Sequence, residues 1–132
     1  MSHVEWLSVL GWGSEELEDL RFVGYSYIKQ GKYEIALTFF EALVVLDPQS
    51  AYDHQTLGAL YLQQNNNLMA LNYIEQALRL DPNHLPTQLN RTKALFALGY
   101  KKQGLLQARA LEANPDAEIA HQAQALILAH TS

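Results

Sequence analysis

The chain has 132 residues, a formal net charge of −5 and no cysteine. This length suits one domain, and a hydrophobic content of 48% is more than a disordered acidic chain carries. The negative charge argues against a broad basic face for nucleic acid, and the lack of cysteine excludes disulfides and thiolate metal sites. We therefore expect a cytoplasmic globular domain, with no membrane-spanning segment and no secretory signal.

Residues 1–13 form an apolar lead that stands outside the pattern of the following chain. Its large apolar side chains include Trp6, Leu7, Leu10 and Trp12. Leu7 and Leu10 have helical spacing, and the glycines that follow would loosen the end of such a helix. Two interpretations stay open. The lead is either a short helix that caps the next domain, or an arm for a homodimer or a heterocomplex.

The first pair of helices is predicted over residues 16–30 and 32–46. Ser14 is a favourable N-cap, and the acidic residues after it suit the first turn of a helix. Gly31 supplies a left-handed residue between the two helices. An aspartate followed by Pro48 ends the second helix.

The second pair of helices, expected over residues 51–64 and 68–80, repeats this plan. Ala36 recurs 34 residues later as Ala70, and so does the closing aspartate–proline pair. Three consecutive asparagines replace the glycine turn, since asparagine tolerates the left-handed region. A fixed period of this length indicates stacked helix–turn–helix repeats, each of which alone buries only part of its apolar face.

The third pair, expected over residues 85–98 and 100–113, is a degenerate copy. Gly104 stands at the alanine position, and the closing Pro115 comes one residue early. Terminal repeats are often atypical in this way. The single domain predicted over residues 14–132 comprises repeats at 17–50, 51–84 and 85–115 and a capping helix at about 116–131.

These repeats resemble the tetratricopeptide repeat, whose first helix carries Leu/Val-Gly-x-x-Tyr and whose second carries Ala-x-x-x-Phe before a closing proline. The matching residues are Val23, Gly24, Tyr27, Ala36, Phe40 and Pro48 in the first repeat and Leu57, Gly58, Tyr61, Ala70, Ile74 and Pro82 in the second. The resemblance covers about residues 17–115. It implies an all-α fold, a right-handed α-solenoid of three helix pairs.

A narrower resemblance is to the type III secretion chaperones of the LcrH/SycD class and their smaller relatives. It rests on the three repeats, the apolar lead and the phrase FFEALVVLDP, which begins at Phe39. Members of this family are small, acidic, cytoplasmic bacterial proteins that hold translocator or needle subunits soluble before export. The chain is shorter at both ends than the translocator chaperones. The resemblance therefore implies a protein client but leaves its identity open.

The resemblance also implies that the first helices of the repeats line a concave groove. Its expected lining is Arg21, Tyr25, Ile28, Tyr52, Gln55, Ala59, Leu62, Leu89, Lys93 and Phe96. The expected anchors for an extended or helical apolar segment are Tyr25, Tyr52 and Phe96, because the packing pattern of the repeat does not require these side chains in the core. Tetratricopeptide proteins that grip the C-terminal carboxylate of heat-shock chaperones use a lysine and asparagine clamp. Only Arg21 could serve that role, so that function is not expected.

The sequence carries no pattern that predicts catalysis, a cofactor or a metal ion. The five histidines lack metal-ligand spacing, and there is no phosphate-binding loop or nucleophile elbow. The acidic pairs Glu15-Glu16 and Glu18-Asp19 fit a solvated helix start better than a general acid/base pair.

The leading hypothesis is a protein-binding module that masks an apolar segment of a type III secretion client until export. One alternative is an adaptor that assembles an unrelated protein complex. Another is a domain that regulates an enzyme by binding it. The sequence separates these three poorly.

Overall fold

Residues 5–131 are described by the computed structural model, and these residues form eight helices and no strand. In chain order the helices are α1 (Trp6–Leu10), α2 (Ser14–Lys29), α3 (Tyr33–Leu46), α4 (Ala51–Gln63), α5 (Asn67–Leu80), α6 (Leu85–Ala97), α7 (Lys101–Glu112) and α8 (Ala117–Thr131). Each helix predicted for the repeats and the cap is present, with its ends within two residues of the predicted positions. Residues 1–4 of the predicted lead and Ser132 of the predicted domain lie outside the described residues.

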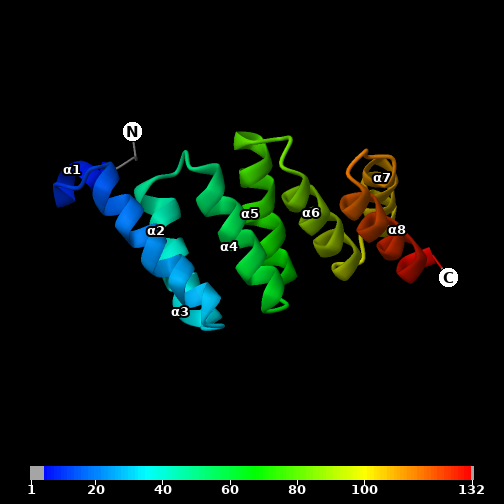
Figure 1. Ribbon diagram of the computed structural model, residues 1–132, viewed down its shortest axis with the longest axis horizontal. Helices are drawn as coiled ribbons and strands as arrows, with labels where there is room; N and C mark the ends of the chain where they lie inside the picture. The colour runs from blue at the N-terminus through cyan, green and yellow to red at the C-terminus, as the bar shows by residue number, and fades with distance from the viewer. Residues whose placement is uncertain (1–4, 132) are drawn as a thin grey trace.

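The helices stack in antiparallel pairs along one axis, so the two ends of the chain lie at opposite ends of the molecule (Figure 1). Helix α2 packs on α3, α4 on α5, and α6 on α7, while α3 and α5 also pack on the first helix of the next pair. Helix α8 packs on α7 and α6, as the first helix of a fourth pair would. The predicted all-α solenoid with a capping helix is confirmed.

The turn within each pair contains one residue with a left-handed backbone. Gly31 has φ of 74° and Gly99 has φ of 85°, and Asn65 takes the same place in the second pair with φ of 63°. Asparagine tolerates this region better than most residues with a side chain. The three turns therefore have the same shape, although only two of them contain glycine.

The starts of α2 and α4 are capped by different groups. Ser50 precedes α4, and its hydroxyl accepts a hydrogen bond from the backbone N–H of Asp53 at 3.3 Å, as expected for an N-cap. The prediction that Ser14 caps α2 is wrong, because Ser14 is already the first helical residue. The Gly13 N–H donates instead to the carboxylate of Glu16 at 2.6 Å, which fixes the start of the helix one residue earlier.

Small residues mark the points where the paired helices cross. Ala36 and Ala70 are fully buried. A Cβ atom on Gly24 would lie 2.9 Å from the ring of Phe40, and one on Gly58 would lie 2.8 Å from the side chain of Ile74. Side chains of the partner helices therefore fill the space beside these glycines and leave no room for a larger residue.

Two separate clusters contain most of the buried apolar side chains, and a few more are buried outside them, namely Ala77, Ala94, Leu95, Phe96 and Ala108. The first cluster fills the first two helix pairs, and its fully buried large members include Phe40, Leu43, Leu57 and Ile74. The second cluster lies between the third pair and the capping helix, and it comprises Leu89, Leu111, Ile119 and Ala123. Helix α8 thus contributes its buried side to the core of its own end of the molecule.

The lead folds as α1 beside the end of α3. Leu7 packs against the first cluster, which agrees with the capping interpretation for this residue. Trp6 and Leu10 remain 44% and 48% exposed, and Trp12 is half-buried. Part of the lead therefore covers the core, while its other large side chains face outward.

Candidate functional site

A hollow of about 590 Å³ opens between α2 and the start of α4. The residues that line it are Glu18, Arg21, Phe22, Tyr25, Asp47, Ser50 and Tyr52. Two of the expected anchors, Tyr25 and Tyr52, line this hollow, and their side chains are 47% and 45% exposed. The fold thus brings together two open aromatic rings from different repeats.

Both rings are positioned by contacts to side chains of the first repeat. The ring of Tyr52 meets the buried ring of Phe40 edge-on, with centroids 6.1 Å apart. The ammonium of Lys29 lies 5.8 Å from the centre of the Tyr25 ring, one helical turn away. The two rings are therefore oriented while a large part of each stays open.

Arg21 forms the wall of this hollow and is bound by three carboxylates. Its Nε and Nη2 atoms donate to the two oxygens of Asp53 at 2.8 and 2.7 Å. Nη2 also donates to Asp47 at 2.6 Å, and Nη1 donates to Glu18 at 2.6 Å. The hydrogen bonds to Asp53 are the main cause that raises the pKa of the Arg21 guanidinium, and burial opposes them in part. Arg21 is thus engaged by this chain's own carboxylates.

Asp53 is the site residue that the sequence did not reveal. It is fully buried, and the fork of Arg21 satisfies both of its carboxylate oxygens. Asp53 lies on α4 and Arg21 on α2, so the pair bridges the first two repeats behind the lining of the hollow. A buried carboxylate of this kind depends on its partner, because removing that partner leaves an uncompensated charge.

A second hollow of about 600 Å³ lies between α6 and α8. Its lining residues are Asp81, Asn83, His84, Leu85, Pro86, Leu89, Asn90, Lys93, Asp116, Glu118, Ile119 and Gln122. Leu89 and Lys93 of the expected groove face this hollow from α6, in the repeat positions that Arg21 and Tyr25 hold in α2. The two hollows therefore follow the same repeat register.

The structure corrects the expected role of the third repeat. Phe96 is only 7% exposed, because its ring packs where a Cβ on Gly104 would sit and the ring of His130 stacks on it with centroids 4.2 Å apart. Leu89 is 4% exposed and belongs to the second core cluster. Phe96 is therefore not an open aromatic anchor, and Leu89 serves packing more than the surface.

Two family models, both described as "Tetratricopeptide repeat", match residues 22–50 and residues 51–84. The chain is a tetratricopeptide-repeat protein. No curated protein sequence matches it significantly.

Solved structures of tetratricopeptide-repeat proteins share its fold. PcrH, known from Pseudomonas aeruginosa and solved with the chaperone binding region of PopD, superimposes with a TM-score of 0.79 at 28% identity, over 92% of this chain and 95% of PcrH. The Yersinia enterocolitica type III secretion chaperone SycD, with a peptide of the translocator YopD, gives 0.74 at 24% identity, over 89% and 96% of the two chains. The first repeat domain of Spaghetti (RPAP3), bound to an HSP90 peptide, gives 0.78 at 22% identity over all of both chains. The protein thus resembles type III secretion chaperones, and its fold is also that of other peptide-bound repeat domains.

The remaining predicted groove residues of this tetratricopeptide-repeat protein lie between the two hollows. Gln55 and Ala59 on α4 are partly exposed. Ile28 and Leu62 are also partly exposed, and both pack against the first core cluster. These four residues can therefore offer some surface to a ligand, although Ile28 and Leu62 are already partly buried by packing against the core.

The described part of this repeat protein shows no metal-binding cluster. Within residues 5–131, no three histidine, aspartate or glutamate side chains gather as metal ligands would. Buried side-chain nitrogen and oxygen atoms in the same residues all have hydrogen-bond partners. No helix among these residues is long and apolar enough to cross a bilayer.

Proposed function

We propose that this tetratricopeptide-repeat protein is a chaperone that holds an apolar segment of a type III secretion protein on its concave face until export. The observation that carries the proposal is the pair of open rings, Tyr25 and Tyr52, at one hollow between two repeats. A few buried aromatic anchors supply much of the affinity of most interfaces, and rings already held in place lose little freedom when a ligand arrives.

The solved relatives support the choice of client. PcrH and SycD were solved with segments of PopD and YopD, and PcrH resembles this chain over nearly its whole length. We infer that the present chain holds a segment of a secreted or export component in the same general way. The client segment would meet Tyr25 and Tyr52 through apolar side chains, so that these are kept from nonspecific association.

A second candidate is an adaptor that assembles an unrelated complex. It is favoured by the match to Spaghetti, whose repeat domain was solved with the HSP90 peptide SRMEEVD. The contacts of Arg21 argue against recognition of a terminal carboxylate in the first hollow, because its guanidinium already binds three carboxylates of this chain. An apolar internal segment fits that hollow better than an acidic chain end.

The test compares what the wild-type protein and Tyr52→Ala capture from the source cell. Export proteins should be captured by the wild type and lost with the variant, while Leu106→Ala on the exposed face of α7 should behave as the wild type does. Calorimetry with a captured client should show a loss of about 1–2 kcal/mol or more for Tyr52→Ala. Circular dichroism should show nearly unchanged helicity and melting temperature, because the ring is half open before binding.

The other outcomes of this experiment are equally clear. Partners unrelated to secretion that still depend on Tyr52 would favour the adaptor. If a folded Tyr52→Ala variant captures the same partners as the wild type, the client binds elsewhere on the molecule. Unfolding of the variant would show that Tyr52 is part of the core.

A further inference from the structure

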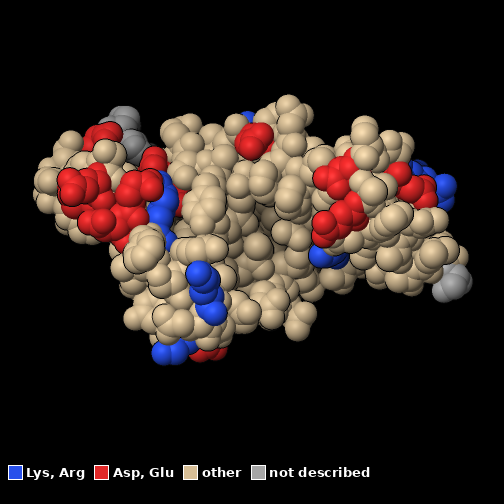
Figure 2. Space-filling model, in the orientation of Figure 1, with Lys and Arg blue, Asp and Glu red and all other residues tan. Residues whose placement is uncertain are grey.

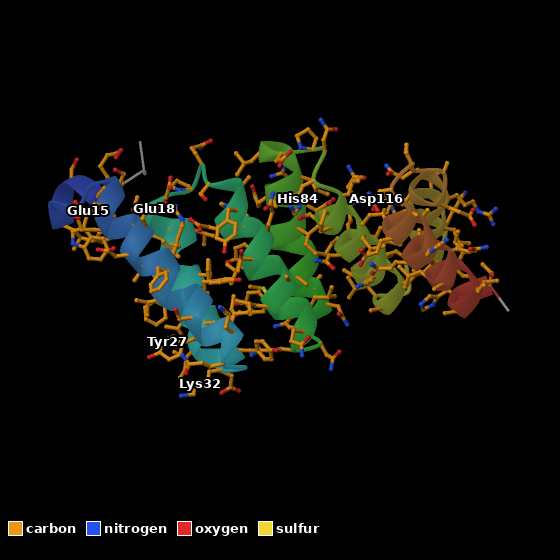
Figure 3. All side chains as sticks on the ribbon, in the orientation of Figure 1. Glu15, Glu18, Tyr27, Lys32, His84 and Asp116 are labelled. Atoms are coloured by element: carbon orange, nitrogen blue, oxygen red, sulfur yellow. The ribbon has the colours of Figure 1, made fainter. Side chains whose placement is uncertain are left out.

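Carboxylates recur along one edge of the concave surface. Asp47 and Asp81 follow the last residues of α3 and α5, and Asp116 precedes α8. Each loop that connects one helix pair to the next, or to the capping helix, therefore contains one aspartate. Glu18 and Glu118 add to them from the early turns of α2 and α8. These five residues, hereafter the acidic rim, all line one of the two hollows. The labelled Glu18 and Asp116 lie along the upper edge in Figure 3.

The charges inside each hollow do not cancel. In the first, the carboxylates of Glu18, Asp47 and Asp53 surround the single guanidinium of Arg21. Arg21 is not available to neutralise a client, because turning away would leave the buried Asp53 without its partner. The first hollow therefore keeps an excess of negative charge.

The second hollow repeats this imbalance with different residues. Asp81, Asp116 and Glu118 line it together with one cation, Lys93. Figure 2 shows acidic side chains gathered over the start of α2 and again near α8, at the two ends of the surface. The rim is therefore a source of negative potential at both ends of the direction in which a client would lie.

Positive charge collects at the opposite edge. Lys29 and Lys32 flank the turn between α2 and α3, and Lys32 lies at the lower edge in Figure 3. Lys101 and Lys102 begin α7 after the corresponding turn of the third repeat. The lysines at the turns of the first and third repeats thus give the two flanks of a bound segment different charges to face.

The first hollow also has a feature that suits a cation directly. The ring of Tyr25 is 47% exposed, and the ammonium of Lys29 lies 5.8 Å from its centre, so the ring has open surface and an environment that suits a positive group. Tyr25, Tyr52 and the rim residue Glu18 line the same hollow. A lysine or arginine could lay its apolar stem on the rings and direct its charge to the rim.

From this arrangement we infer that the client segment is amphipathic and cationic, with apolar side chains on Tyr25 and Tyr52 and lysine or arginine on the flank that meets the acidic rim. This inference rests on the proposed function, because it supposes that the concave surface holds the client.

The test uses two synthetic peptides of about 18 residues, or about five helical turns. They share the same apolar positions and differ only in the flanking polar positions, which are lysine in one and glutamate in the other. Fluorescence anisotropy with the full chain, at low and high salt, measures both affinities. We expect the lysine peptide to bind about tenfold more tightly, with the difference shrinking as salt screens the charges.

A rim variant with matched controls assigns the effect. Glu18→Gln/Asp81→Asn/Glu118→Gln removes three rim charges and should abolish most of the preference for lysine. Glu34→Gln/Glu41→Gln/Glu112→Gln removes three exposed carboxylates that do not line either hollow, and should preserve it. Equal binding of both peptides that is lost in Tyr52→Ala would overturn the inference and leave the groove proposal standing. If the lysine peptide binds the Tyr52→Ala variant and the rim variant as tightly as the wild type, or if neither peptide binds, both the cationic-client inference and the groove proposal are overturned.

Discussion

Arg21 joins the first two repeats through a carboxylate that water does not reach. Its guanidinium matches both oxygens of Asp53, and this geometry makes Arg21 part of the fold as well as part of the hollow. The sequence placed Arg21 on the groove but gave no signal for Asp53. The matching positions in the other repeats are Asp19 and Thr87, so the 34-residue period does not mark the pair.

The bridge between Arg21 and Asp53 can be tested by stability. We expect Arg21→Met to lower the free energy of unfolding by about 3 kcal/mol, because it strands the buried Asp53 carboxylate. Arg21→Met/Asp53→Asn should recover most of the loss, since it removes the stranded charge. Denaturant unfolding of the three proteins measures both effects. A single variant as stable as the wild type would mean that water reaches Asp53 through the hollow.

The helices themselves are the part of the structure that the sequence predicts best. Their ends follow from local residues such as Gly31 and Pro48, whose backbone preferences act without the rest of the fold. The exposure of a side chain depends on distant packing, and here the sequence is weaker. The repeat pattern does not require Phe96 inside and the resemblance places it on the groove, but Gly104 and the last turn of α8 enclose its ring.

The helix crossing at Ala70 provides the test at this scale. We expect Ala70→Leu to lower the free energy of unfolding by about 1–3 kcal/mol, because the added carbons have no space between α4 and α5. Ala110→Leu, at an exposed position of α7, is the matched control and should change stability little. Thermal melts compare them. An unchanged melting temperature for Ala70→Leu would contradict the packing described for this crossing.

The two ends of the solenoid are finished differently. At the C-terminal end, α8 buries Ile119 and Ala123 against the third pair. At the other end, Val23 of α2 stays exposed, although Leu57, which matches it one repeat later, is fully buried in the first core cluster. The short α1 does not cover this face and adds exposed apolar side chains of its own.

We propose that this exposed end supports self-association through the lead. Sedimentation of the wild-type chain should then show concentration-dependent association. Trp6→Ser/Leu10→Ser should remain monomeric, because it removes two apolar side chains that are about half exposed and leaves the packed Leu7 unchanged. Leu106→Ser on α7 is the control and should associate as the wild type does. If all three are monomeric at high concentration, α1 is a cap and nothing more.

The division of the core into two clusters sets how the molecule opens. In an array held by contacts between neighbours, each region can unfold with its own free energy. The cluster at Leu89, Leu111, Ile119 and Ala123 is the smaller one, and outside it the ring of Phe96 also packs on α7 and α8. The backbone amides of α7 and α8 should therefore exchange with solvent through openings that leave α4 and α5 intact. A client bound across both halves would slow amide exchange in α7 and α8 toward the rate in α4 and α5. The slowing would extend to residues that the client does not contact.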